Sequence, residues 1–292
     1  MSGWELALSS ATAAVSVPRR RRLRIRRPQV AVGAGIVVAI CLAAFLAPVI
    51  APYTPNAVNP GSALVPPSAA HFMGTDFVGR DVFSRVLYGA REDIVVVVLI
   101  TYVGLIVGVF LGSIAGYFGG WFDALIGRVA DTAIAFPFIV LVLAIIAIVG
   151  PGIEGVAIGI IAVGWALYAR LARSEMLSLK EQSFMLATKA LGYSHARSIF
   201  RHALPNLIRS SLVYSTIDVV VNLLVLAGLS YLGVGVQEPG ADLGTVIANG
   251  QPYLLTAWWI ATMPGLVLVL FGIGVSLIGE GLTEGELVLS SL

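Results

Sequence analysis

Few side chains in this 292-residue chain have the type and spacing that enzyme chemistry requires. A P-loop that holds ATP needs Gly-x4-Gly-Lys-Ser/Thr, but the only two lysines, Lys180 and Lys189, stand in other contexts. The single cysteine, Cys41, excludes a disulfide framework and a cysteine-based zinc site. The three histidines are too scattered for a metal cluster: His71, His195 and His202. We therefore expect no catalytic residue, no bound cofactor and no metal site in this chain.

One carboxylate stands out because it lies within a strongly apolar stretch. Asp218 and Asn222 are four residues apart, which places them on one face of a helix. A carboxylate inside a membrane is costly, so it faces a cavity or a polar partner. Asp218 either hydrogen-bonds within a helix bundle or lines a translocation path, where it would meet a substrate amine or cation. Both interpretations stay open.

The composition shows what surrounds these residues. Hydrophobic residues make up 58% of the chain and charged residues only 12%, and the mean hydropathy is +0.93. A soluble globular protein has about 25% charged residues. The solvent of much of this chain must therefore be lipid. This excludes a cytosolic enzyme, a nucleic-acid-binding domain and a disordered scaffold.

Six apolar stretches are long enough to cross about 30 Å of hydrocarbon. An arginine run, between Arg19 and Arg27, precedes the first of them, whereas the expected outside loops hold only Arg80, Arg85 and Arg91. This asymmetry predicts an even number of spans with both termini in the cytoplasm. We expect the spans at Val30–Ile50, Ile94–Tyr117, Val129–Val149, Gly155–Ala172, Ser210–Leu232 and Leu254–Gly279.

The arginine run is interpreted as a topology anchor that also attracts lipid headgroups. Rival interpretations are a nucleic-acid-binding arm and the start of a cleaved signal peptide. The apolar run that follows, about 21 residues, is too long for a signal peptide. We expect membrane lipid, and no nucleic acid, as the partner of this segment.

The predicted segments divide the chain into five parts. Proline residues make the stretch 51–75 extended, and Arg80–Asp93 fits a short helix on the outer membrane surface. The parts are a basic cytoplasmic segment (1–28), the first span (29–51), an outside loop (52–93), a core bundle (94–282) that contains a cytoplasmic loop (173–209), and a cytoplasmic tail (283–292).

The second span carries a glycine at every fourth position. Such a stripe lets another helix approach closely. Tight internal packing is one interpretation, and a sliding or gating seam is the other. The stripe consists of Gly104, Gly108, Gly112 and Gly116.

The cytoplasmic loop contains a pattern of two short amphipathic helices. Ser183 is expected to cap the first helix, Gly192 to end it in the left-handed conformation, and Ser194 to cap the second. Pro205 is expected to stop the second helix. The first helix has an apolar face that needs a partner, which is the membrane surface, the bundle itself or another protein. This face consists of Phe184, Leu186, Ala187, Ala190 and Leu191.

This loop resembles the cytoplasmic signature of binding-protein-dependent ABC importer permeases, EAA-x3-G-x9-I-x-L-P. The signature maps onto Leu186-Ala187-Thr188, Gly192, and His202 with Leu204-Pro205. The spacing holds, but Leu186 replaces the Glu, Thr188 the second Ala, and His202 the Ile. Four further segments resemble the C-type permease of dipeptide and oligopeptide importers: Gly74–Arg91, Gly116–Pro137, Leu229–Pro239 and Trp258–Gly265. The resemblance as a whole covers residues 30–282.

The resemblance implies an all-α membrane protein with the six-helix type I ABC importer permease fold, located in the bacterial plasma membrane. It implies that the helix before Gly192 docks on an ATPase and that ATP and Mg belong to that partner. Implied partners are a homologous B-type permease, two ATPase subunits or domains, and an extracytoplasmic substrate-binding protein. Arg80 and Asp81 would meet this binding protein, orient the outside helix, or simply form a solvated helix face.

A different class of protein is the main alternative. An autonomous secondary transporter or channel would use Asp218 directly, and it usually has coupling acids in several spans and inverted repeats. The sequence indicates one clear intramembrane acid and no repeat. A membrane scaffold without transport would not need the two-helix pattern of the cytoplasmic loop. Dipeptides, oligopeptides, haem, nickel chelates and oligosaccharides all remain open as the substrate.

Overall fold

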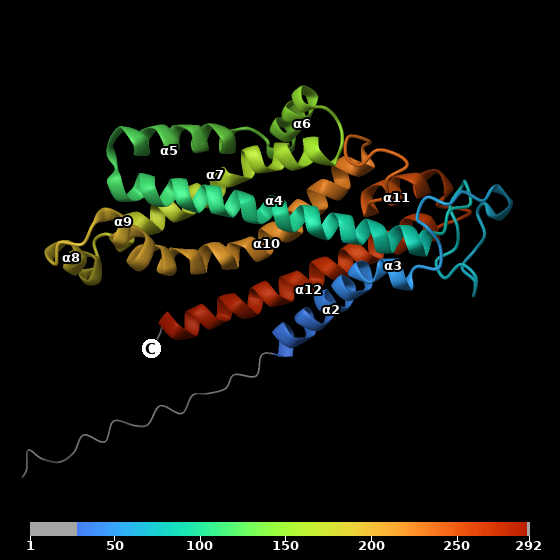
Figure 1. Cartoon of the computed structure of the whole chain (residues 1–292), viewed down its shortest axis with the longest axis horizontal. Helices are drawn as coiled ribbons and strands as arrows, with labels where there is room; N and C mark the ends of the chain where they lie inside the picture. The colour runs from blue at the N-terminus through green and yellow to red at the C-terminus, as the bar shows by residue number, and fades with distance from the viewer. Residues whose placement is uncertain (1–27, 291–292) are drawn as a thin grey trace, which may run out of the picture.

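The computed structural model describes residues 28–290, with side chains described for 28–282 (Figure 1). All regular elements in this range are helices. The arginine run before Pro28 and the final residues of the predicted tail lie outside it. The helices are α2 (Pro28–Phe45), α3 (Ala47–Ile50), η1 (Pro60–Ser62), α4 (Val82–Phe118), α5 (Gly120–Ala135), α6 (Phe138–Val149), α7 (Ile153–Leu179), α8 (Ser183–Ala190), α9 (His195–Arg197), η2 (Ser198–Ala203), α10 (Leu204–Tyr231), α11 (Leu243–Gly250), η3 (Gln251–Tyr253) and α12 (Trp259–Ser290).

The described chain has five helices that are long and apolar enough to cross a membrane. They are α2, α4, α7, the run from α9 through α10, and α12. The bent pair of α5 and α6 makes a sixth if it counts as one span. The predicted all-α membrane bundle is therefore confirmed, with five to six spans.

The third predicted span, Val129–Val149, is wrong as a single straight helix. The chain bends by 99° between α5 and α6. Pro137 has no N–H to donate, and it disfavours helical geometry in the residue before it. Phe136 is accordingly extended, with ψ 147°.

The predicted short helix at Arg80–Asp93 is also wrong as a separate element, because α4 continues from Val82 into the second span without a break. Asp81 caps its start by accepting a hydrogen bond from the Ser84 backbone N–H at 2.8 Å. The face that we expected on the membrane surface is covered by protein. Gly89 lies directly against the backbone of Asp242, just before α11.

Pro205 does not stop a helix, contrary to expectation. Residues Ser198–Ala203 form a π-helix, η2, that continues directly into α10. The Leu204 N–H bonds to the carbonyl of Ile199, five residues back, so the wide turn ends where the proline begins. Pro205 then lies in the first turn of α10, where a missing N–H does least harm.

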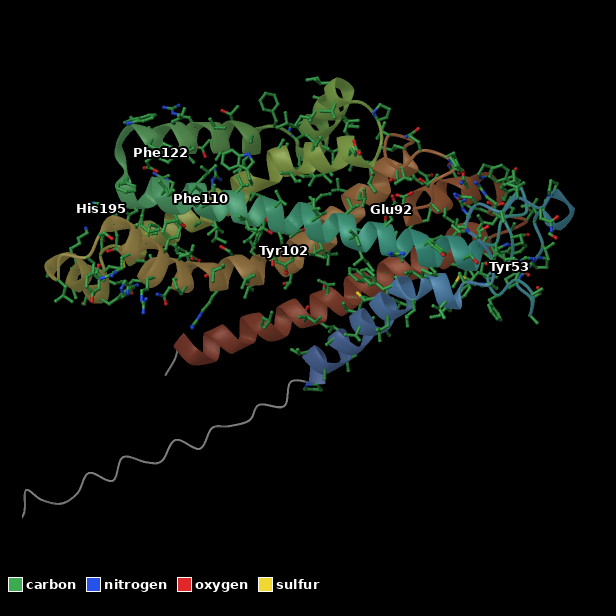
Figure 2. The ribbon with its side chains drawn as sticks, viewed as in Figure 1. Tyr53, Glu92, Tyr102, Phe110, Phe122 and His195 are labelled. Atoms are coloured by element: carbon green, nitrogen blue, oxygen red, sulfur yellow. The ribbon has the colours of Figure 1, made fainter. Side chains whose placement is uncertain are left out.

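The long helices run along one another in two groups (Figure 1). α4, α7 and α10 pack together, and α2 lies along α12. α8 and α9 form one end of the molecule, and α11 with the proline-rich loop forms the other. Figure 2 marks these two ends with His195 and Tyr53. We call them the α8 end and the α11 end.

The glycine stripe of α4 faces α7. A Cβ atom added at Gly108 would strike the carbonyl of Trp165, and one at Gly112 would strike the carbonyl of Ala169. At Gly116 the backbone of Arg173 is similarly close. Gly104 differs, because its nearest neighbours would be 3.8 Å away. Three of the four glycines therefore set the distance between the two helices.

Candidate functional site

The corner between α8 and α9 is built as the sequence predicts at Gly192 and Ser194. Gly192 has φ 71°, a conformation that side chains rarely adopt. Its N–H bonds to the Lys189 carbonyl, and the Tyr193 N–H bonds to the Thr188 carbonyl, both at 3.0 Å, which closes the end of α8. The Ser194 side chain accepts from the Arg197 N–H and caps α9.

Ser183 does not cap α8, although serine is a common N-cap residue and the sequence predicted that role. It is the first residue of the helix, and the N-cap position belongs to Gln182, which makes no side-chain cap bond. Met185 and Leu186 donate their N–H groups to the Gln182 carbonyl. Within the described part of the chain, backbone hydrogen bonds alone cap the start of α8.

One face of α8 packs inward, and it is not the predicted apolar face. Met185 is fully buried against Met176 and Ile199. Thr188 is 5% exposed and accepts a hydrogen bond from the hydroxyl of Ser198 at 3.3 Å. These contacts tie α8 to the ends of α7 and α10.

The predicted apolar face is left uncovered in this structure. Leu186 is 51% exposed and Leu191 is 69% exposed, and Phe184 and Ala187 are exposed beside them. Of the two motif residues that end the signature, Leu204 packs partly against α4 and α7, whereas Pro205 is exposed. The corner thus presents an apolar surface on a fixed backbone.

Asp218 lies in a hydrogen-bonded network that joins three helices. Its carboxylate accepts from the hydroxyl of Tyr168 on α7 at 2.9 Å and from the Asn222 amide at 3.0 Å. The same amide donates to the hydroxyl of Thr101 on α4, also at 3.0 Å. This geometry supports the interpretation that Asp218 bonds within the bundle.

Replacing Asp218 separates the two interpretations. Asparagine keeps an oxygen that can accept from Tyr168 and Asn222, so we expect Asp218→Asn to fold and transport like the wild type. Asp218→Leu leaves both donors without their acceptor, at a cost of about 1–3 kcal/mol, and should lower the unfolding temperature of the purified protein. A loss of transport in a well-folded Asp218→Asn variant would instead show that the charge itself acts in the path.

At the α11 end, Arg80 is the centre of an ion-pair cluster. Its Nε is 2.6 Å from Asp76 Oδ2, and its Nη1 is 2.6 Å from Glu238 Oε2. The Asn249 amide donates to the same glutamate at 2.7 Å. The Arg80 side chain is only 6% exposed. Asp81 is 2% exposed because its carboxylate caps α4. Neither residue forms the solvated face that the sequence suggested.

Arg85 ties the two loops of this end together. No structural role was predicted for Arg85 from the sequence, yet the residue is 1% exposed. Its guanidinium donates to the Pro55 carbonyl and to the Gly240 carbonyl, each at 3.3 Å. The proline-rich loop and the loop before α11 are therefore joined through one side chain, which no local sequence pattern indicates.

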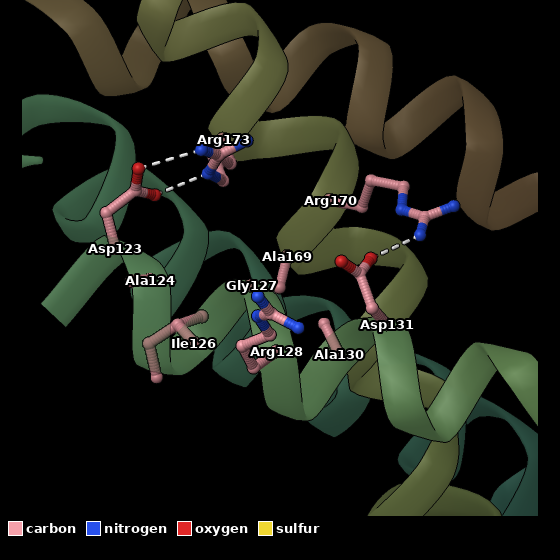
Figure 3. A pocket seen from close by; sticks show the side chains of 10 residues that line it. All are labelled: Asp123, Ala124, Ile126, Gly127, Arg128, Ala130, Asp131, Ala169, Arg170 and Arg173. Carbon is pink, nitrogen blue, oxygen red and sulfur yellow. Dashed lines mark hydrogen bonds and ion pairs between the residues drawn. The ribbon is translucent and has the colours of Figure 1, made fainter. Parts of the chain in front are cut away.

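A second charged group lies between α5 and α7 (Figure 3). Arg173 forms two bonds with Asp123, one of them at 2.7 Å, and Arg170 bonds to Asp131 at 2.5 Å. Asp218 was the one intramembrane acid expected from the sequence. Asp131 and Arg170 fall inside the third and fourth predicted spans, so the signal was present and was missed.

Residues 108–283 match the family described as the binding-protein-dependent transport system inner membrane component. The chain belongs to this family. Residues 20–67 match the N-terminal TM domain of oligopeptide transport permease C. The resemblance inferred from the motifs is therefore confirmed, and this permease is a multi-pass protein of the bacterial inner membrane.

Several curated relatives of the permease span nearly the same length. The dipeptide transport system permease protein DppC of Alkalihalophilus pseudofirmus is 38% identical over 272 residues, which cover 93% of this chain and 90% of the relative. The probable D,D-dipeptide transport system permease protein DdpC of Escherichia coli is 35% identical, with 88% and 86% covered. The oligopeptide transport system permease protein OppC of Bacillus subtilis is 36% identical, with 90% and 86% covered.

The permease should show a pH dependence at Glu238. Burial alone would raise the pKa of this carboxyl, but hydrogen bonds from Arg80 and Asn249 and the charges of Arg80 and Arg85 outweigh burial, so the pKa is lowered. Stabilisation from a lowered pKa is present at neutral pH and is lost as the pH falls through the folded-state pKa. The gap in unfolding temperature between wild type and Glu238→Gln should therefore narrow below about pH 4.

The expected gap is small, because 46% of the Glu238 side chain is exposed and solvent screens its ion pairs. Glu154→Gln is the matched control, since Glu154 makes no ion pair within the described residues. A gap that stays constant from pH 7 to strongly acidic pH would contradict this assignment.

Proposed function

We propose that this permease is a transmembrane subunit of an ATP-driven ABC importer for dipeptides, oligopeptides or solutes of similar size. The observation that carries the proposal is the α8 corner, which holds an exposed apolar face on a fixed backbone. An apolar helix face of this kind needs a protein partner. The relatives named above are permeases of dipeptide and oligopeptide transport systems, and they support the substrate class.

The partner of the α8 face is an ATPase. This chain has no P-loop lysine, so ATP and Mg bind to the ATPase subunits or domains and this chain itself is not an enzyme. The α8 end is then cytoplasmic, as are both termini, which agrees with the arginine run before Pro28. An extracytoplasmic binding protein delivers substrate at the α11 end.

The way in which α8 is attached lets it drive the bundle. Met185 packs on Met176 at the end of α7, and η2 continues from α9 directly into α10. A shift of α8 caused by ATP binding is thereby passed to two long helices as a rigid displacement. One bundle forms half of a pathway, and a homologous B-type permease supplies the other half.

Co-purification tests this proposal. The tagged permease is extracted from its native membrane, and the proteins that accompany it are identified by mass spectrometry. We expect a P-loop ATPase and a second permease with the wild type. In Leu186→Asp/Leu191→Asp the ATPase should be lost and the second permease kept, because a charge in the apolar face opposes docking.

Ser174→Asp is the matched control. It adds a charge at an exposed position of α7 near the same end, outside the α8 face. A wild-type permease that purifies without any ATPase would overturn the proposal. So would a Leu186→Asp/Leu191→Asp variant that retains the ATPase in full.

A further inference from the structure

A polar pocket opens between α5 and α7, away from the Asp218 network. Its volume is about 220 Å³. Five charged side chains surround it (Figure 3): Asp123, Arg128, Asp131, Arg170 and Arg173. A pocket of this size holds a small solute or one end of a larger molecule, because sites for whole drug-sized ligands start at about 300 Å³.

One guanidinium of this pocket has no partner. Asp123 forms an ion pair with Arg173, and Asp131 forms one with Arg170. Arg128 is exposed and forms no ion pair or side-chain hydrogen bond with the rest of the described chain. The pocket therefore carries one surplus positive charge with five N–H donors, the geometry that binds a carboxylate.

Part of the pocket lies at membrane depth. At 1.5 Å per residue, Arg170 is about 25 Å along α7 from Ile153, within the roughly 30 Å that hydrocarbon covers. Asp131 lies about 12 Å along α5 beyond Asp123, on the side away from the α8 end. A long arginine side chain can extend to the membrane surface, but an aspartate at this depth is too short to do so.

These deep charges are nevertheless exposed. Asp131 is 62% exposed and Arg170 is 54% exposed. Charged side chains inside a membrane face water or a protein partner rather than lipid, because lipid cannot solvate them. The α5–α7 face therefore borders water or a protein partner, and not lipid.

We infer that this pocket is a binding site for the charged terminus of a peptide on the inner part of the translocation path, with Arg128 taking the peptide carboxylate. The inference rests on the function proposed above and names a site within it. The Asp131–Arg170 pair is exposed and formed by a single hydrogen bond. It can separate, so that Asp131 takes the ammonium group of the same zwitterion.

Cysteine labelling tests whether the pocket holds water. Ala124 lines the pocket and is exposed, and Leu125 is exposed beside it but does not line the pocket. Ala124→Cys and Leu125→Cys are made in the intact transporter after Cys41→Ser, in inside-out vesicles. Membrane-impermeant thiol reagents should label Ala124→Cys and spare Leu125→Cys, whose side chain lies outside the pocket. An Ala124→Cys variant that stays unlabelled would overturn the inference.

The charge of the reagent tests Arg128. An anionic sulfonate reagent should react with Ala124→Cys about tenfold faster than a cationic ammonium reagent, because a fixed charge concentrates its counter-ion to that extent. Arg128→Gln should remove this preference. Equal rates for both reagents before the Arg128 change would show that the pocket does not attract anions.

Peptide protection tests the ligand. Alanyl-alanine should slow the labelling of Ala124→Cys by about threefold or more at saturating concentration, whereas its C-terminal amide should not, because the amide lacks the anionic group that a guanidinium binds. Protection by anionic lipid alone, or by the second permease alone, would overturn the peptide assignment. ATP-driven peptide uptake by the Cys41→Ser parent is measured in parallel. A parent that imports peptide while the pocket shows no protection would contradict the binding site alone, whereas a parent without uptake would contradict the proposed function.

Discussion

Gly112→Val should prevent α4 and α7 from reaching their observed distance. The valine Cβ would lie against the Ala169 carbonyl, and this obstacle is backbone, which no change of rotamer can remove. Overpacking of this kind costs about 1–3 kcal/mol and sometimes more. Here we expect the upper end of that range, because the neighbouring contacts at Gly108 and Gly116 hold the same interface. The detergent-extracted variant should elute as aggregate in size-exclusion chromatography.

Gly104→Ala is the matched control for this effect. It lies on the same stripe, but its added Cβ would meet nothing within 3.8 Å. Alanine also favours a helix by about 1 kcal/mol relative to glycine, so this variant should be as stable as the wild type or more so. If Gly112→Val unfolded at the wild-type temperature, the stripe would not set the α4–α7 distance.

Arg80→Leu should have the second large effect. Asp76, whose side chain is 2% exposed, would be left with a buried charge and without its guanidinium partner. Removal of one partner from a buried ion pair costs about 3–5 kcal/mol. Asp76 would still accept the backbone N–H bonds of Val78 and Arg80, so part of the charge remains solvated. We expect a lower unfolding temperature and rapid proteolysis of the loop before α4.

Two further variants show whether the unpaired buried charge of Asp76 causes the loss of stability in Arg80→Leu. Asp76→Asn in the Arg80→Leu background removes the unpaired charge and should restore part of the lost stability. Arg91→Leu removes an exposed arginine whose one contact within the described residues is with the Phe45 ring, and it should change little. Equal losses in Arg80→Leu and Arg91→Leu would mean that the ion pair contributes nothing specific.

Local sequence signals predicted the parts of this fold that depend on neighbouring residues. The apolar stretches gave the positions of the spanning helices, because burial in lipid requires about 20 apolar residues in a row. Gly192 and Ser194 predicted the α8 corner, since positive φ and helix capping each favour particular residue types. The glycine spacing of α4 pointed to close packing with another helix.

Features that depend on distant partners were not predictable from the sequence. Nothing near Arg85 reveals that it reaches carbonyl groups at Pro55 and Gly240. The apolar pattern of α8 failed in a different way. Its most hydrophobic face is exposed, because the helix buries Met185 and Thr188 instead. Pro205 predicted a helix end. Instead the π-helix η2 ends just before it, and the proline lies in the first turn of α10.

The π-helix η2 also fixes the direction in which the α8 corner points. Six residues of η2 connect the corner directly to α10. A π-helix has more residues in each turn than an α-helix, so these six residues turn the chain about as far as five α-helical residues would. The wide turn thus absorbs one residue of length between Gly192 and Pro205, and the continuous helix sets the direction of the corner independently of the chemistry of its face.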